Sequence, residues 1–262
     1  MASARAVPPA KCKAVSQAIS VSLAGPALAE ACFTRLAAAN PDPRCELEYS
    51  TPFELLVAVV LSAQATDRAV NRVTRRLFAQ ARTPAALLAL GEAGLKDHIR
   101  TIGLYNSKAR HLLATCRRLV DRHGGEVPAE RAALEALPGV GRKTANVVLN
   151  TAFGAETIAV DTHLFRVAQR IGLASGKTPR AVEDGLLAVL PARFRRGAHH
   201  WLILHGRYTC TARRPRCATC LLYDLCHWPE KGPAPAQVAQ DGWPAPIQDG
   251  RPGPSRIPGK DS

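Results

Sequence analysis

The sequence lacks three features that would point to other kinds of protein. It contains no run of 18 or more apolar residues, which excludes an ordinary transmembrane helix. Alternating apolar and polar residues, the pattern of half-buried strands, are scarce, whereas Gly and Pro separate segments with helical periodicity. No Asp or Glu precedes Glu30, so the N-terminal part differs in composition from the rest. Together these absences predict an all-α protein with an N-terminal extension.

Acidic residues are few for the length of the chain. There are 35 Lys and Arg against 21 Asp and Glu, which gives a formal charge of +14 and a pI near 9.9. The segments 1–24 and 231–262 carry only +3 and +1 of this charge, so the part between them keeps about +10. A basic folded part is typical of proteins that bind nucleic acids, although secreted and membrane-surface proteins can be equally basic.

The two terminal segments have compositions that favour disorder. Residues 1–24 are rich in Ala, Ser and Val, and residues 231–262 contain seven Pro and five Gly in 32 positions. The stretch Ile19–Ala29 faintly resembles the apolar region of a signal peptide, but Pro26 interrupts it. We therefore expect two disordered extensions, with neither export nor organelle targeting.

The segment Leu137–Thr144, which reads LPGVGRKT, is the most informative part of the chain. Helical spacing precedes it at Pro128–Leu137, with Pro128 suited to a first-turn position, and follows it at Arg142–Phe153. The pattern predicts two helices joined by a glycine turn.

Gly139 and Gly141 flank the apex of this turn, where a positive φ or a close backbone approach would require glycine. Backbone N–H groups at the start of the second helix can then bind a phosphate, which the helix dipole also favours. An ordinary helical corner uses the same turn. Lys143, on the first turn of the second helix, favours the anion-binding alternative.

The eight cysteines form two groups. Cys12, Cys32, Cys45 and Cys116 are scattered, and we interpret them as free or buried thiols. The others, Cys210, Cys217, Cys220 and Cys226, lie within 17 residues in the pattern C-x6-C-x2-C-x5-C. Four thiolates so close can bind one compact metal centre. Zinc sites usually contain two short cysteine pairs, and disulfides suit a small secreted domain better. The pattern therefore favours a [4Fe–4S] cluster.

Three arginines lie between the first two cysteines of this group. Arg213, Arg214 and Arg216 belong to the sequence TARRPR, which a metal centre would hold in one place. We expect this loop to bind phosphate groups, and the alternative is a set of solvated arginines on a rigid loop.

Five motifs in order carry a resemblance to a known family. They are LSAQATD at Leu61–Asp67, GLYNSKA at Gly103–Ala109, LPGVGRKTA, VDTH at Val160–His163, and the cysteine pattern. The chain in this respect resembles the endonuclease III family, the helix-hairpin-helix DNA glycosylases with AP-lyase activity. The resemblance extends from about Leu28 to about Trp228, roughly three quarters of the chain.

The resemblance implies the catalytic residues. Lys143 matches the catalytic lysine of the family and Asp161 its catalytic aspartate. A lysine amine can displace a base and form a Schiff base with the deoxyribose, after which β-elimination breaks the strand on the 3′ side. Asp161 lies 18 positions further on, so it must approach from a separate element. By itself Asp161, directly before Thr162, reads as a helix N-cap, and both roles can hold.

The resemblance also implies the residues that contact DNA. Gln64 and Leu104 correspond to the residues that fill and wedge open the space left by an extruded base, whose unstacking costs a few kcal/mol. Gln64 falls in an apolar helical pattern, Val57–Ala65. Further expected contacts with the DNA backbone are Lys108, beside the wedge, and Gly139, Val140, Gly141 and Arg142 of the hairpin. No spacing among His163, His199, His200 and His205 specifies a metal site, and we interpret them as structural or phosphate-facing.

The architecture implied by the resemblance is two helical domains flanking a DNA-binding cleft. One would combine residues 25–43 with 158–230 and hold the cluster. The other would be a six-helix barrel over residues 44–157 that contains the helix-hairpin-helix at about 128–153. The implied partner is double-stranded DNA with oxidised pyrimidines or abasic sites, bound by a monomer in the bacterial cytoplasm, near the nucleoid and without a membrane.

Two alternatives to this interpretation differ in chemistry. A monofunctional adenine glycosylase of the same superfamily shares the cysteine pattern, but it lacks the hairpin lysine and carries a C-terminal recognition domain. Here Lys143 is present, and residues 231–262 are too few and too rich in proline for a domain. A non-catalytic DNA-binding module with a structural metal is the second alternative.

Overall fold

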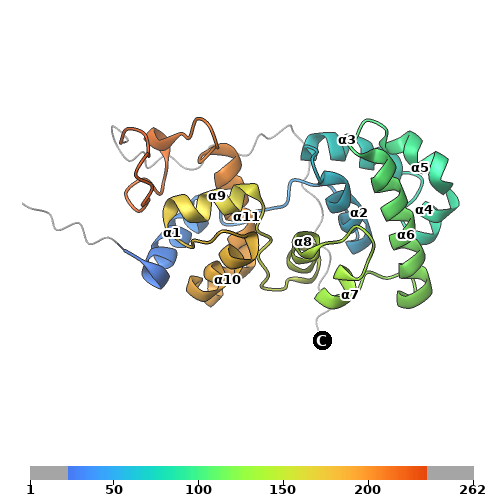
Figure 1. The fold of residues 1–262 in the computed structure, drawn as a ribbon, viewed down its shortest axis with the longest axis horizontal. Helices are drawn as coiled ribbons and strands as arrows, with labels where there is room; N and C mark the ends of the chain where they lie inside the picture. Colours follow the sequence, from blue (N-terminus) through green and yellow to red (C-terminus); the bar gives the residue numbers. More distant parts are fainter. Residues whose placement is uncertain (1–22, 235–262) are drawn as a thin grey trace, which may run out of the picture.

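The computed structural model describes residues 23–234, and all regular secondary structure within this range is helical (Figure 1). The elements are α1 (Gly25–Ala39), α2 (Pro52–Ser62), α3 (Asp67–Phe78), α4 (Pro84–Ala89), α5 (Gly91–Ile99), α6 (Tyr105–His123), α7 (Arg131–Glu135), α8 (Arg142–Phe153), α9 (Thr162–Ile171), α10 (Pro179–Val189), α11 (Ala192–Tyr208) and the 3-10 helix η1 (Cys217–Thr219). The all-α prediction is confirmed. Most of the predicted disordered extensions, 1–24 and 231–262, lies outside the described residues. None of the described helices is long and apolar enough to cross a membrane.

The helices α2 to α8 surround a first hydrophobic core. Helix α2 lies at its centre and packs against α3, α6 and α8. Its side chains Leu55, Leu56 and Leu61 are completely buried, and each such burial contributes about 2 kcal/mol to folding. A helix that is apolar on all sides must be covered on all sides, and this explains why the other helices wrap around α2.

A second hydrophobic core joins α1, from the start of the described chain, to α9, α10 and α11. Phe33 of α1 packs against Phe194 and Trp201 of α11, with ring centroids 5.9 and 6.1 Å away. The indole N–H of Trp201 donates to the backbone oxygen of Asn40 at 2.8 Å, which fixes the end of α1. The chain returns from the first core to the second near residue 158 (Figure 1).

The stretch 44–157 contains seven α-helices, so the expectation of six was wrong. Gly91 has a positive φ of 65°, and the chain bends there, which separates α4 from α5. The first helix of the hairpin also differs from the prediction. It is the five-residue helix α7, which begins at Arg131, because Glu130 keeps an extended conformation. Pro128 therefore precedes the helix and does not lie in its first turn.

Threonine side chains fix the starts of several helices. The hydroxyl groups of Thr51, Thr66, Thr83 and Thr178 accept hydrogen bonds from backbone N–H groups in the first turns of α2, α3, α4 and α10. Three of these caps are followed directly by Pro, whose missing N–H costs nothing at the first helical position.

Two groups of ion pairs connect the cores. Arg142 of α8 binds Glu183 of α10 through two hydrogen bonds of 2.9 and 2.8 Å, although Glu183 is only 3% exposed. Arg207 of α11 binds both Asp67, at the start of α3, and Glu46 of the connecting segment. Arg142 therefore joins α8 of the first core to α10 of the second core. Arg207 joins α11 of the second core to α3 of the first core and to the connecting segment.

The Arg142–Glu183 ion pair leads to a first prediction, which concerns the stability of the protein. Substitution of Glu183 by Ala leaves Arg142, which is partly exposed, without its bidentate partner and lowers the free energy of unfolding by about 2 kcal/mol. The adjacent residue offers a matched control, because Asp184 forms an exposed pair with Arg180 on the same helix. The substitution Asp184→Ala costs about 0.3–0.5 kcal/mol. Chemical denaturation measures both values, and equal losses would contradict the structural role of Glu183.

Candidate active site between the two cores

The predicted helical hairpin is formed by α7, the turn and α8. Helix α8 spans Arg142–Phe153, as the sequence predicted. Helix α6 supports the turn, because the hydroxyl of Thr115 donates to the backbone oxygen of Pro138 at 2.7 Å. Val140, expected to contact DNA, is 5% exposed, and its side chain belongs to the first core.

The two glycines of the turn have different roles. Gly139 has a φ of +76°, and a Cβ atom there would lie 2.8 Å from the Cβ of His111. Gly141 is the N-cap of α8 with a φ of −95°, which any residue adopts, and a Cβ there would meet nothing within 4 Å. Only Gly139 therefore has the positive φ that the turn was expected to need, whereas at Gly141 the expected close approach of a ligand to the backbone stays a prediction. Gly141 is exposed, and no side chain covers the start of α8 at this position.

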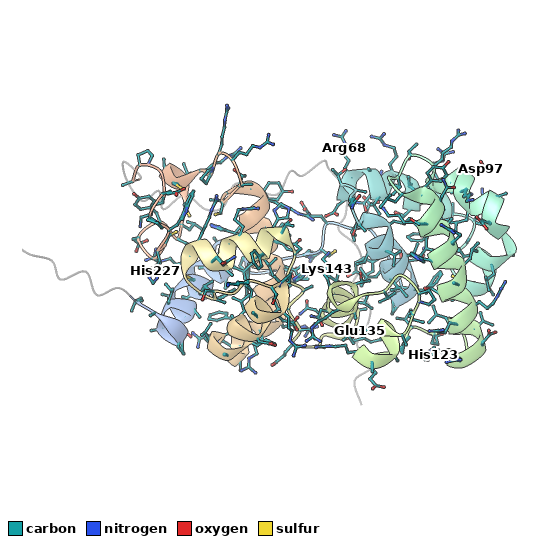
Figure 2. All side chains as sticks on the ribbon, viewed as in Figure 1. Arg68, Asp97, His123, Glu135, Lys143 and His227 are labelled. Atoms are coloured by element: carbon teal, nitrogen blue, oxygen red, sulfur yellow. The ribbon has the colours of Figure 1, made fainter. Side chains whose placement is uncertain are left out.

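Lys143 and Asp161 come from different helices and line one cavity. Figure 2 labels Lys143 near the middle of the molecule. Lys143 is exposed on the first turn of α8. Asp161 is the N-cap of α9, and its Oδ1 accepts hydrogen bonds from the N–H groups of His163 and Leu164 at 2.8 and 2.9 Å. Both bonds use the same oxygen, so Oδ2 is not needed for the cap. The carboxylate is thus held rigidly and keeps an oxygen for other chemistry.

Charged and polar side chains form much of the rest of this cavity. Arg207 binds the carboxylates of Glu46 and Asp67, and the hydroxyl of Tyr208 also donates to Glu46. Burial disfavours the charge on Arg207, but the two carboxylates more than offset this and raise its pKa. One arginine therefore pairs with both of these carboxylates.

Two histidines of α11 line the same cavity. Burial lowers the pKa of His199 far below its usual range, and the nearby His200, Lys143 and Arg207 add to this effect. Burial and Arg207 lower the pKa of His200 to about 4. Both rings are therefore neutral at physiological pH.

Gln64 and Leu104 are the two non-glycine residues with positive φ in the described part of the chain, at 57° and 60°. This conformation is uncommon for side chains of their kind and is often found at functional sites. Both are exposed, Leu104 to 58%. Their loops are neighbours, since a Cβ on Gly103 would lie 3.8 Å from the backbone oxygen of Gln64. Helix α2 ends at Ser62, so Gln64 lies beyond the helix in which the sequence placed it.

Lys108 connects these two loops and is not available to DNA. Its side chain is 4% exposed, and Nζ donates to the backbone oxygens of Leu61 and Ala63 at 2.9 and 2.5 Å. The expected phosphate contact of Lys108 was therefore wrong, because burial and two carbonyl partners occupy its ammonium group. The guanidinium of Arg142 is similarly paired with Glu183, so it is not free for the predicted contact with DNA.

The four C-terminal cysteines line a second, separate cavity beyond α11. Their sulfurs have neighbours that suit a buried anionic group. Arg170 approaches the sulfur of Cys210 at 3.6 Å, and His205 lies 3.8 Å from the sulfur of Cys220. Burial raises the pKa of the Cys220 thiol to about 12, so this thiol needs the charge of a bound metal to become a thiolate.

The lining of this cavity fits an iron–sulfur group. Four free thiols surround the one cavity. Four cysteine thiolates are the ligands that a [4Fe–4S] cluster requires.

The arginine loop lies between the first two of these cysteines. Arg213, Arg214 and Arg216 are all exposed. The loop is held from behind, because the guanidinium of Arg170 donates to the backbone oxygens of Thr211 and Ala212 at 2.8 and 3.0 Å. The predicted phosphate-binding arginines are thus free on a fixed backbone.

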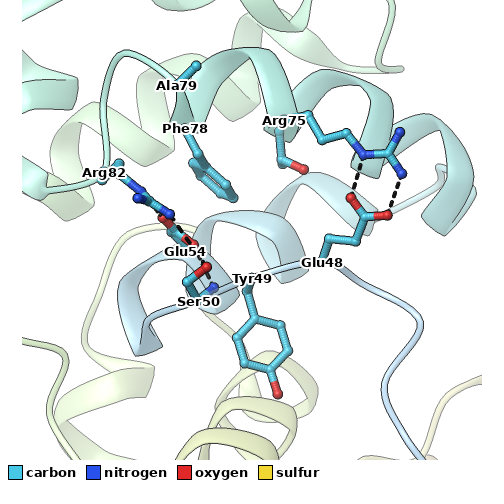
Figure 3. A pocket seen from close by; sticks show the side chains of 9 residues that line it. Glu48, Tyr49, Ser50, Glu54, Arg75, Phe78, Ala79 and Arg82 are labelled. Carbon is cyan, nitrogen blue, oxygen red and sulfur yellow. Dashed lines mark hydrogen bonds and ion pairs between the residues drawn. The ribbon is translucent and has the colours of Figure 1, made fainter. Parts of the chain in front are cut away.

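Another cavity, between α2 and α3, contains none of the predicted site residues (Figure 3). Its charged side chains are paired with each other. Arg82 donates to Glu54 at 2.8 Å, and Arg75 donates to Glu48. Glu54 also accepts from the backbone N–H of Ser50, so these groups stabilise the start of α2.

Sequence reasoning missed part of the Lys143 cavity. Arg207, Glu46 and Asp67 were not singled out, although Asp67 is the last residue of the LSAQATD motif. The pattern gave no signal for Arg207, which becomes part of the site only because α11 packs against α9. The sequence predicts a structural or phosphate-facing role for His199 and His200, and the structure places both in this cavity.

Comparisons with known proteins agree with this geometry. Residues 57–192 match the HhH-GPD superfamily of base excision DNA repair proteins, and residues 210–226 match the iron-sulfur binding domain of endonuclease III. The chain is 63% identical to endonuclease III of Escherichia coli K12 over 198 residues, 76% of this chain and 94% of that protein. It is 61% identical to that of Treponema pallidum over 196 residues, 75% of this chain and 93% of that protein.

Solved structures give the same result. A trapped endonuclease III–DNA covalent intermediate matches with a TM-score of 0.72 and 47% identity, over 76% of this chain and 93% of that chain. A thermostable thymine-DNA glycosylase matches with a TM-score of 0.70 and 25% identity, over 78% and 98%. The cofactor is accordingly a [4Fe–4S] cluster, for which Cys210, Cys217, Cys220 and Cys226 are the candidate ligands.

The different roles of the two turn glycines lead to a second prediction, which also concerns stability. Gly139→Ala lowers the free energy of unfolding by about 1–3 kcal/mol, because it combines a positive φ with a Cβ that collides with His111. Gly141→Ala changes it by less than about 0.5 kcal/mol. Urea denaturation of the two variants checks the difference, and a Gly139→Ala variant as stable as the Gly141→Ala variant would refute it.

The cysteine cavity makes a third prediction. The purified protein contains about four irons per chain, and Cys217→Ser loses most of them. Cys116→Ser, outside the group of four, serves as the control and keeps the iron. Metal analysis and visible absorption measure the content. Stoichiometric zinc in place of iron would contradict the assignment.

Proposed function

Because this chain belongs to the endonuclease III family of HhH-GPD base excision repair proteins, we propose that Lys143 and Asp161 perform its chemistry on damaged DNA. The protein is a base excision repair DNA glycosylase, and AP-lyase activity is characteristic of its family. The observation that carries the proposal is that Lys143 and Asp161, from separate helices, line one cavity next to both cores. The substrate is duplex DNA with an oxidised pyrimidine or an abasic site.

In the first step the Lys143 amine attacks C1′ of the damaged nucleotide. The N-glycosidic bond breaks, and the base leaves with the bonding electrons. Positive charge develops on the sugar, and the carboxylate of Asp161, held as a helix cap, stabilises it.

In the second step the sugar ring opens to a protonated Schiff base between C1′ and Nζ of Lys143. Loss of a proton from C2′ and departure of the 3′ phosphate break the strand by β-elimination. Water then hydrolyses the imine and regenerates the lysine. The step needs no metal, so the role of the cysteine site is to hold the arginine loop.

The DNA contacts follow from the exposed groups around the cavity. Gln64 and Leu104 occupy adjacent protruding loops, and they fill the gap that the extruded base leaves. The open backbone at Gly141 and the start of α8 bind one phosphate, with Gly139 shaping the turn. Arg213, Arg214 and Arg216 bind phosphates on the cluster side of the cleft.

The proposed domain division follows the two cores. Residues 25–43 and 158–230 form the cluster domain, and residues 44–157 form the helical barrel. One chain supplies both Lys143 and Asp161, which suits a monomer. The substrate places the enzyme at the nucleoid in the bacterial cytoplasm.

Borohydride trapping tests the proposal, because reduction of a Schiff base joins protein and DNA permanently. We expect wild type to form a covalent adduct with an abasic duplex and Lys143→Ala to form none. Lys177→Ala, an exposed lysine between α9 and α10, is the matched control and traps normally. Asp161→Asn slows base release about a hundredfold. An undiminished adduct with Lys143→Ala would refute the assignment of the nucleophile.

A further inference from the structure

The Lys143 cavity contains two buried nitrogen atoms that the mechanism does not use. His199 is 2% exposed, and its Nδ1 has no hydrogen-bond partner among the described residues. The same holds for Nε2 of the adjacent His200. The two rings meet edge to face with centroids 5.1 Å apart, and both line the cavity with Lys143 and Asp161.

Several other polar side chains of this cavity already have partners. Glu46 and Asp67 bind Arg207, and the hydroxyl of Ser62 donates to the backbone oxygen of Val59 at 2.8 Å. Asp161 uses one oxygen for its cap. The two histidines are therefore neutral groups of this cavity, each with a buried ring nitrogen that no hydrogen bond uses.

The charge state of the two histidine rings indicates which kind of ligand they can bind. Both rings are neutral, since burial lowers the pKa of each and His200 reaches about 4. A neutral imidazole has one donor nitrogen and one acceptor nitrogen, and it does not attract a phosphate as a cation does. The expectation that these histidines face phosphates is therefore not supported, and an uncharged ligand with donors and acceptors suits them better.

An extruded pyrimidine has these properties. Its edge carries carbonyl acceptors and N–H donors, and these groups have lost their Watson–Crick partners. A buried polar atom without a hydrogen-bond partner costs free energy. A ligand whose polar edge forms hydrogen bonds with both imidazoles removes this cost on both sides and therefore binds more tightly. The apolar side chains of the same cavity, such as Leu47 and Ile203, suit the faces of a ring.

We propose that His199 and His200 read the damaged base, with Nδ1 of His199 and Nε2 of His200 hydrogen bonded to the polar edge of the extruded pyrimidine. This inference rests on the proposed function, because it places the base beside Lys143. It assigns the two histidines to recognition of the base, before the glycosidic bond breaks. An abasic site has no base and therefore gains nothing from them.

The experiment compares two rates for each variant. One is single-turnover base release from a duplex that contains dihydrouracil, and the other is strand cleavage of the same duplex with a preformed abasic site. In His200→Leu the rate of base release falls at least about tenfold relative to abasic-site cleavage, because one hydrogen bond to the base is lost. His200→Gln places an amide near the position of Nε2 and restores most of the ratio.

His199→Asn and His199→Leu form a second pair, in which Asn places a polar atom near the position of Nδ1. His123→Leu, far from Lys143 at the end of α6, is the control and changes neither rate (Figure 2). Thermal unfolding and iron content show whether each variant is folded.

Each result has a defined meaning. An unchanged ratio in both His200→Leu and His199→Leu would overturn the inference, and so would a loss that His200→Gln does not restore. Wild-type protein that cleaves no abasic site would instead refute the proposed function. Lys143→Ala loses both activities, so its effect is distinguishable from that of the histidines.

Discussion

The ion pair between Arg142 and Glu183 sets the geometry on which the site depends. Arg142 directly precedes Lys143 on α8, and its guanidinium binds a buried carboxylate of the other core. Lys143 and Asp161 belong to helices that pack into different cores, so the distance between them is fixed only if the cores are held together. Arg142, next to the proposed nucleophile Lys143, therefore holds the two cores together, and its guanidinium is paired with Glu183.

A second constraint is the backbone conformation at the two protruding loops. Gln64 and Leu104 keep positive φ values although neither is glycine. The buried ammonium of Lys108 binds the carbonyls that lead into Gln64, and Leu104 immediately precedes the helix that carries Lys108. One internal cation thus supports both loops, and the backbone strain is located in the two loops that we propose enter the DNA stack.

The local sequence pattern predicted some elements correctly. It failed where contacts between distant parts of the chain determine the conformation. Helix α8 matched the prediction because Gly141 and Gly154 mark its two ends and its apolar stripe is regular. The helical pattern around Val57–Ala65 continued past the true end of α2, since nothing in the pattern shows the bonds from Lys108 that hold the loop. Of the turn glycines, only Gly139 needed its special conformation, and the neighbour that makes this so, His111, lies on another helix.

The sequence by itself determined the all-helical fold, the hairpin lysine, the capping aspartate and the group of four cysteines, because these depend on residue type and spacing along the chain. Tertiary structure decided which charges remain available. It committed Lys108 to backbone carbonyls and Arg142 to Glu183, left Arg213, Arg214 and Arg216 exposed, and brought two neutral histidines to the Lys143 cavity. The physical reason is that desolvation and partner distance depend on how helices pack, and no local pattern contains that information.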